Sequence, residues 1–228
     1  MIRSLLIACV CLVTLTGAGC NATTPEDSDA EAPYTEEEIN YFMEVALGSE
    51  YGGASATIKK WTSDLRIRVS GLPTEDDRAT LNQVISELNA LLQPIELRLV
   101  DESPAIEMYF VPPEDFSQYE PNYVPGNLGF FYAYWNADCE IGRATILIST
   151  DDLTQPRRSH LIREELTQTL GLMRDAGRYS DSIFYDEPTT ATAYSAIDET
   201  VIEMLYRPEL TPCMGAEDVR DTLETLDA

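Results

Sequence analysis

The chain of 228 residues carries 40 acidic and 15 basic side chains, which give a formal net charge of −25. A uniformly acidic surface repels phosphate backbones and anionic headgroups, so this charge argues against nucleic-acid binding and against electrostatic docking on lipid. The hydrophobic content of 44% excludes a disordered chain, and the single histidine, His160, excludes a metal site built from several histidines.

The first 19 residues predict a removable export signal. Arg3 precedes an apolar run from Leu5 to Leu15, and small residues lead into Cys20. The run is too short for a spanning helix, and the small residues are typical of a bacterial lipobox. We therefore expect residues 1–19 to be a lipoprotein signal peptide and Cys20 to be lipidated. An unlipidated cleaved signal and an uncleaved anchor are the alternatives.

Residues 20–36 predict a disordered acidic tether behind the lipidated cysteine, because they are polar, contain proline and lack apolar periodicity. Several acyl chains at Cys20 would anchor the protein stably to a membrane. Asn21 is not the aspartate that retains lipoproteins at the inner membrane. The sequence therefore predicts the bacterial cell envelope, at the outer membrane, as the location.

Two cysteines remain after the signal and the lipidated residue, namely Cys139 and Cys213. In an oxidising compartment they predict one disulfide, which would close a loop of about 75 residues. Two separate thiols are the alternative.

Residues 37–228 predict a single α+β domain, with a twisted mixed sheet packed on helices, because no repeat or linker interrupts them. Thr35 with Glu38, and Thr74 with Asp77, form capping boxes that begin helices reaching Leu47 and Gln93. Alternating or apolar runs predict strands over residues 65–69, 95–100, 106–111, 130–135 and 144–149. Further helices are expected over residues 156–172, 195–206 and 216–226, the second of them capped by Ser195 with Asp198, with an irregular segment over 175–192.

The helix expected over residues 156–172 carries the polar side chains on which the functional interpretation depends. At 100° per residue, Ile162, Leu166 and Leu170 share one face of this helix. Glu164, Glu165 and Gln168 lie together on the other face.

The order of strand, helix, glycine turn and irregular loop resembles the site of zincin metalloproteases. Those enzymes bind zinc through a His-Glu-x-x-His helix, and metzincins add a third histidine after a glycine turn. Here Glu165 matches the glutamate and Gly171 the turn, whereas the histidine positions hold Glu164, Gln168 and Arg174. Because an amide is a poor zinc ligand and a guanidinium stays protonated, the resemblance implies a degenerate metal site.

A second resemblance is more specific. The motifs that carry it are Glu164–Leu172, Asp181–Phe184, Ile197-Asp198 and Leu205–Pro208, with Tyr41-Phe42 and Ile58–Trp61 upstream. Together they resemble a family of proteobacterial lipoproteins, domain of unknown function family 2927, over most of residues 36–225. This resemblance implies an exported, often lipidated, zincin-like domain with no established activity.

The candidate catalytic residues are Glu164, Glu165 and Gln168, since a carboxylate in an enclosed cleft can act as an acid or a base. The alternative is a solvated acidic face. The candidate metal ligands are His160, Glu164 and Asp175. A hard cation such as calcium, bound by the carboxylates of Glu164, Asp175, Asp181 and Asp186, is a further possibility. We expect no cofactor and no zinc-protease activity.

Eight of the 20 aromatic residues lie between residues 116 and 135. We expect half of them in the core and the others on a surface that binds ligand, with Tyr132, Tyr134, Trp135 and Tyr185 as candidates. The sequence thus predicts a lipid-anchored, zincin-like domain that binds an envelope protein, peptide or glycan. A hydrolase that uses Glu165 with an unusual ligand set and an envelope scaffold with a vestigial cleft are the alternatives.

Overall fold

The structure, a computed structural model, describes residues 33–48 and 57–226. The expected signal peptide, Cys20 and the tether up to residue 32 lie outside the described residues. Within the described ranges, no helix has the length and apolar character needed to cross a membrane.

Five strands form one sheet in the order β2-β1-β3-β5-β4. Four of them run parallel: β1 (Leu65–Gly71), β2 (Leu97–Leu99), β3 (Ile106–Val111) and β5 (Ile141–Ser149). The edge strand β4 (Gly129–Trp135) is antiparallel to β5. This mixed sheet, packed with helices in a single domain, confirms the α+β prediction.

Capping boxes begin three of the helices, because the side chain of each cap residue accepts a backbone hydrogen bond that the first turn would otherwise leave unmade. The caps of α1 (Glu36–Ala46), α2 (Glu75–Leu91) and α5 (Ala196–Tyr206) are the predicted ones, and Ser195 with Asp198 forms the third capping box. The other helical segments are η1 (Pro113–Asp115), α3 (Phe116–Tyr119), α4 (Gln155–Gln168) and α6 (Ala216–Glu224).

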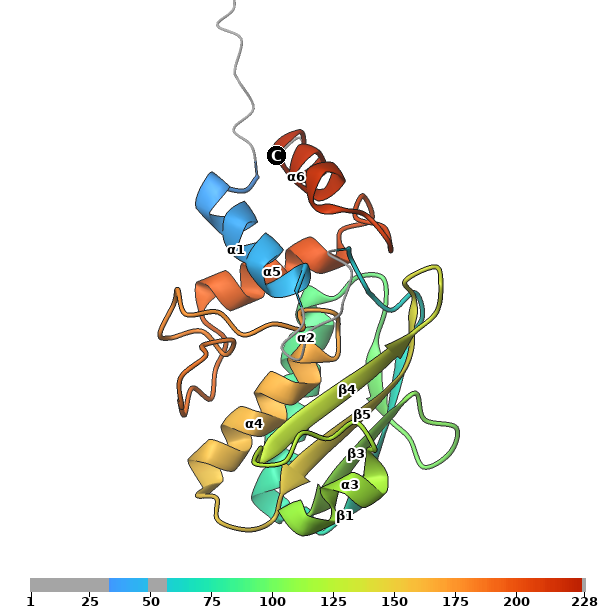
Figure 1. The fold of residues 1–228 in the computed structure, drawn as a ribbon, viewed down its shortest axis with the longest axis vertical. Helices are drawn as coiled ribbons and strands as arrows, with labels where there is room; N and C mark the ends of the chain where they lie inside the picture. The colour runs from blue at the N-terminus through green and yellow to red at the C-terminus, as the bar shows by residue number, and fades with distance from the viewer. Residues whose placement is uncertain (1–32, 49–56, 227–228) are drawn as a thin grey trace, which may run out of the picture. The chain divides into compact units, whose positions relative to one another are not determined.

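Helices cover the two faces of the sheet unequally. α2 and α4 pack together on one face, whereas the short α3 lies on the opposite face (Figure 1). The main core therefore lies between the sheet and α2 and α4, and extends to α1 and α5. A small second cluster on the other face consists of Val111, Phe116, Phe130 and Leu147.

Several elements are shorter than the sequence predicts, and β2 and α4 differ most. β2 begins at Leu97 instead of residue 95, and the Asn89 side chain accepts a hydrogen bond from the Leu97 N–H and donates one to its carbonyl. α4 ends at Gln168 instead of residue 172. The chain turns there because Gly171 has a φ of 124° and lies against the carbonyl of Lys59, where no side chain fits.

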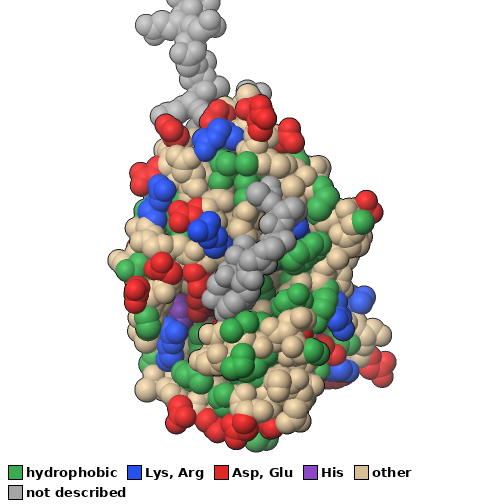
Figure 2. Space-filling model, in the orientation of Figure 1, with side chains coloured by type: hydrophobic (Ala, Val, Ile, Leu, Met, Phe, Trp, Pro, Cys, Tyr) green, Lys and Arg blue, Asp and Glu red, His purple; other side chains and the backbone are tan. Residues whose placement is uncertain are grey.

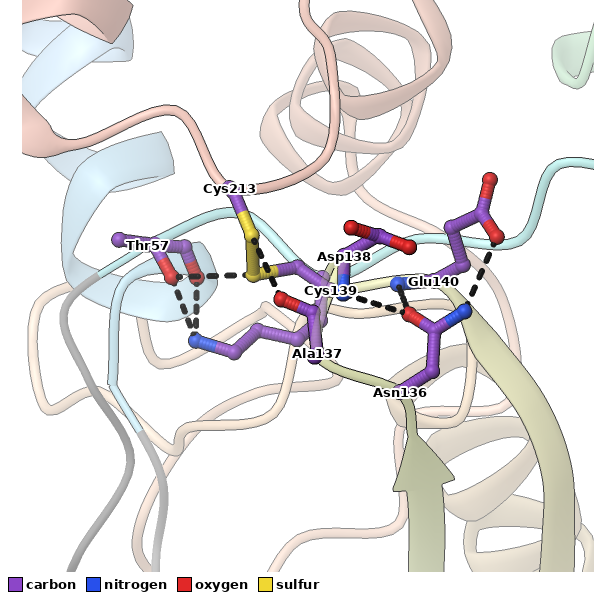
Figure 3. The surroundings of a disulfide bond; sticks show 8 residues. Thr57, Asn136, Ala137, Asp138, Cys139, Glu140 and Cys213 are labelled. Carbon is purple, nitrogen blue, oxygen red and sulfur yellow. Dashed lines mark hydrogen bonds between the residues drawn. A yellow bond between two sulfur atoms is a disulfide. The ribbon is translucent and has the colours of Figure 1, made fainter.

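Cys139 and Cys213 form a disulfide bond, as predicted, with their Cα atoms 5.2 Å apart (Figure 3). The bond joins the turn between β4 and β5 to the segment that precedes α6. Asn136 shapes this turn, since its side-chain oxygen accepts hydrogen bonds from the N–H groups of Asp138 and Glu140, both at 2.9 Å. The disulfide therefore fixes the C-terminal segment to the end of the sheet.

Replacing both cysteines by serine should lower the free energy of unfolding by about 4 kcal/mol, because the unfolded chain regains the freedom of a long loop. Urea denaturation of the wild type with and without reductant gives the comparison. Reductant should destabilise the wild type by the same amount and leave the double variant unchanged. Equal stability of the oxidised wild type and the variant would contradict this role of the bond.

Candidate functional site

A cavity of about 310 Å³ lies between the polar face of α4, the start of β4 and the irregular segment that follows α4. The candidate residues His160, Glu164, Glu165, Gln168, Asp175 and Tyr185 all line it. Figure 2 shows acidic side chains gathered beside the purple histidine on this face of the molecule. The structure thus brings together the side chains on which the sequence interpretation rested.

Gly129 sets the distance between β4 and α4. A Cβ atom at this position would lie 2.5 Å from Oε1 of Glu165 and 2.7 Å from Cδ2 of Leu161, which is too close for either atom. The missing side chain therefore allows the strand to approach the helix. As a result, the Glu165 carboxylate lies directly against the beginning of the edge strand.

Glu164 is held by the chain's histidine. Oε2 of Glu164 is 3.0 Å from Nε2 of His160, one helical turn earlier. Nδ1 of His160 is 2.8 Å from the carbonyl oxygen of Ala191, in the segment that follows the cavity wall. Both nitrogens of this buried imidazole therefore have partners within the protein.

Gln168 is held in a similar way. Its Nε2 donates a hydrogen bond to Oδ1 of Asp175 at 2.6 Å, across the turn at Gly171. Beyond Asp175, the N–H of Ala176 donates to the carbonyl of Phe184, and this contact brings Tyr185 back to the cavity.

The buried carboxylate of Asp198 holds the turn at Asp181–Tyr185 through hydrogen bonds. Ser182 donates a hydrogen bond to Oδ1 of Asp198 at 2.5 Å, and the Ile183 N–H donates to Oδ2 at 3.2 Å. Burial raises the pKa of Asp198, although these hydrogen bonds oppose the effect. The sequence predicts Asp198 as a cap of α5, and in the structure it also fixes the turn at Asp181–Tyr185.

Three further charged residues line the cavity: Arg157, Asp186 and Glu187. The sequence suggests Asp186 only as one of several carboxylates for a hard cation, and it does not point to Arg157 or Glu187. Helical spacing could have identified Arg157, because it lies four residues before Leu161 and seven before Glu164. No sequence pattern points to Glu187, which belongs to the irregular segment. Five carboxylate side chains and one guanidinium therefore line the cavity, so its charge favours a cationic ligand.

The four candidate aromatic residues do not form one surface. Tyr185 lines the cavity, but Tyr132, Tyr134 and Trp135 do not. Tyr132 packs against the small cluster on the α3 side of the sheet, with its ring 4.9 Å from that of Tyr134. The Tyr134 hydroxyl donates to Glu120 at 2.7 Å, which ties it to the loop before β4.

The residues at the histidine positions of the zincin pattern do not fit zinc. Glu164 is paired with His160, and Gln168 presents an amide to Asp175. The side chain of Arg174 extends over Gly48 and does not line the cavity. Across residues 33–48 and 57–226, no group of three or more His, Cys, Asp or Glu side chains is arranged to hold a metal ion.

Substituting Gly129 by alanine should lower the free energy of unfolding by about 1–3 kcal/mol, because the new methyl group overlaps Glu165 and Leu161. Gly142→Ala is the matched control, since a Cβ at this β5 glycine would meet open space. The control should change stability by less than about 0.5 kcal/mol in urea denaturation. Equal stability of the two variants would show that Gly129 does not set the strand–helix spacing.

Comparison with known proteins identifies the family of the chain. No curated protein matches the sequence significantly. Two solved structures of myroilysin are 14% identical to the chain, with TM-scores of 0.43 and 0.45. They cover 66% and 65% of this chain, and the chain covers 83% and 86% of theirs. Residues 35–225, nearly the whole described domain, match one family, so the chain belongs to the family described as Protein of unknown function (DUF2927).

Proposed function

We propose that the protein is an exported, lipid-anchored domain that binds a basic, extended peptide segment of a cell-envelope partner, without zinc-dependent hydrolysis. The observation that carries this proposal is the open cavity on the polar face of α4, where protein partners already occupy Glu164 and Gln168. A cavity with this lining can bind a ligand, but it lacks the donor set that zinc requires.

The order of the elements supports a zincin-like interpretation of the cleft. An antiparallel edge strand, β4, lies beside the helix that carries the candidate residues, and a glycine turn follows that helix. In zincins the corresponding strand binds extended peptide by adding a strand to the sheet. We therefore assign the ligand to the groove between β4 and α4.

The backbone of β4 supports pairing with a peptide. The Ser149 N–H donates to the carbonyl of Leu128, and the register pairs Phe130 with Leu147. In an antiparallel ladder, alternate residues then bond to β5, so Gly129, Phe131 and Ala133 direct their backbone groups away from it. Among the described residues, no strand pairs with this outer edge.

The charge of the cavity selects the side chains of the peptide. Arg157 is the one basic side chain in the lining, and it already donates to the carbonyl of Thr189 at 2.5 Å. Asp186 and Glu187 are exposed at the rim. A lysine or arginine side chain would offset the surplus negative charge, whereas an acidic peptide would be repelled.

Isothermal titration calorimetry with two capped pentapeptides tests the proposal. One peptide alternates alanine with arginine, and the other alternates alanine with glutamate. The arginine peptide should bind, more weakly at high salt, and the glutamate peptide should not. Replacing Asp186 by Asn together with Glu187 by Gln should weaken binding by roughly fivefold. The matched control, Glu217→Gln with Asp218→Asn, removes two exposed charges of α6 and should leave the affinity unchanged.

Two results would overturn the proposal. The first is an absence of binding to the arginine peptide at low salt. The second is one tightly held zinc ion per chain in elemental analysis, since the proposed cleft contains no zinc.

A hydrolase is the second candidate, because Glu165 places a carboxylate oxygen beside the strand on which a peptide would lie. Mass spectrometry of the incubated arginine peptide separates the two functions. Cleavage by the wild type that Glu165→Gln abolishes would establish the hydrolase. An intact peptide with both proteins supports the binding function.

Acylation at Cys20 can be tested by finding which amino groups of the protein react with an amine reagent. Lys59 and Lys60 are the only lysines, and both are buried. The Lys60 amine donates to the carbonyl of Leu210 at 2.8 Å, and burial lowers its pKa to about 8. If the amine of Cys20 is acylated, the native mature protein therefore presents no accessible amine.

An N-hydroxysuccinimide ester should consequently leave the native, membrane-extracted protein almost unlabelled. A version without signal and lipid, beginning at Asn21, is the control and should take one label at its N-terminus. Labelling of the native lipoprotein at Cys20 would contradict N-acylation, and labelling at either lysine would contradict the burial of the amines.

A further inference from the structure

Charged side chains are distributed unevenly over the two faces of the sheet. The five strands contain five charged residues, and strand alternation places all of them on the α3 side, opposite to the core beneath α2 and α4. Four are arginines and one is a glutamate: Arg66, Arg68, Arg98, Arg143 and Glu107. The strands therefore present a basic face in a chain whose formal net charge is −25.

Three of the arginines form one row across the strands. Arg98 of β2 is the register partner of Arg66 on β1. Arg143 of β5 is the partner of Tyr134 on β4. Ala105 lies between Arg66 and Arg143, because its N–H donates to the Arg66 carbonyl and its own carbonyl accepts from β5. With neighbouring strands about 4.8 Å apart, the row from Arg98 to Arg143 spans about 14 Å.

The arginine row has no acidic partner. Arg66, Arg98 and Arg143 are exposed, and no ion pair within residues 33–48 and 57–226 includes them. Arg68, by contrast, is paired with Glu107. Two like charges directly opposite each other destabilise a sheet, so the pairing of Arg66 with Arg98 weakens the fold. An anion bound to the row would reverse this effect.

Two of the three guanidinium groups are held in place. Nε of Arg66 donates a hydrogen bond to the carbonyl of Ser103 at 2.7 Å, beside the start of β3. The guanidinium carbon of Arg143 lies 4.0 Å from the centre of the Tyr134 ring. Because these side chains are already ordered, binding an anion costs less conformational entropy.

We propose that the arginine row binds a linear polysaccharide that carries carboxylate groups. The small side chain of Ala105 leaves the space between Arg66 and Arg143 open to a carboxylate, which a guanidinium binds through two parallel hydrogen bonds. Beyond Arg143, the partly exposed rings of Tyr132 and Tyr134 offer an apolar surface on which the C–H groups of a sugar ring can pack. This site lies on the face opposite to the α4 cleft, and it does not depend on the function proposed for that cleft.

Other anionic partners fit this face less well. β1, β3 and β5 are paired on both sides, so they offer no free backbone groups to a peptide. Acidic residues border the row, before the strands and after β2: Asp64, Glu96, Asp101 and Glu102. They would repel the broad anionic surface of a bilayer or a nucleic-acid duplex, whereas a single polymer chain contacts only the row.

Isothermal titration calorimetry at low salt tests the site with two trisaccharides, the carboxylated tri-galacturonate and the neutral maltotriose. Tri-galacturonate should bind and maltotriose should not. Replacing Arg66 and Arg143 by glutamine should weaken binding about tenfold. The matched control, Arg78→Gln with Arg178→Gln, removes two exposed arginines outside the sheet and should leave the affinity unchanged.

Arg98→Glu separates binding from folding. The new carboxylate would lie opposite Arg66, so this variant should be more stable than the wild type in urea denaturation and should bind tri-galacturonate more weakly. In two-dimensional ¹H–¹⁵N NMR of the wild type, tri-galacturonate should shift the amides of Ala105 and Arg143 and leave Gly129 in the cleft unchanged.

Three results would overturn the proposal. The first is an absence of binding between the wild type and tri-galacturonate at low salt. The second is an equal loss of affinity in the control pair, which would show that only the total charge matters. The third is equally tight binding of the alanine–glutamate pentapeptide, which would assign the row to acidic protein segments. None of these results bears on the arginine pentapeptide in the cleft, so the two proposals can fail separately.

Discussion

The structure depends on the burial of α4, a helix whose buried side chains are mostly polar or charged. Ten of the 14 residues of α4 are buried, and seven of these ten are polar or charged. A buried polar group without a partner costs several times what a hydrogen bond contributes, so each of these side chains must find a partner. The partners come from other elements, and this requirement fixes the surroundings of α4.

Each pairing attaches α4 to a different part of the chain. Arg158 pairs with Asp77 in the first turn of α2, and Arg163 pairs with Glu87 further along the same helix. His160 reaches the segment at Ala191, and Gln168 reaches Asp175 beyond the glycine turn. The polar side chains therefore orient α2, the turn and the irregular segment around one helix, and the cavity is the space left between them and β4. The same pairings remove Glu164 and Gln168 from the ligands available to a metal.

Much of the fold follows from short-range rules that act within a few residues. Thr35, Thr74 and Ser195 mark the helix starts because each cap bonds to its own first turn. The grouping of Glu164, Glu165 and Gln168 follows from helical periodicity, and the disulfide joins the two cysteines that lie beyond the expected signal and lipidation site.

The features that the sequence did not predict depend on distant contacts. Gly129 matters because β4 meets a helix more than 30 residues later in the chain, which no local pattern encodes. Glu187 reaches the cavity through the pairing of Ala176 with Tyr185, inside a segment without regular structure. By contrast, strand alternation does explain why Tyr132 and Tyr134 lie away from the cleft, since both project from the face of β4 opposite to Phe131 and Ala133.

In the proposed complex, a basic peptide lies along β4 and above α4. The most direct test of this position is two-dimensional ¹H–¹⁵N NMR of the labelled domain, titrated with the arginine pentapeptide. We expect the largest shifts at the amides of Gly129, Phe131 and Ala133, with Gly142 unchanged on β5. Shifts confined to the α3 side of the sheet, around Tyr132 and Tyr134, would contradict the account and move the ligand to the other face.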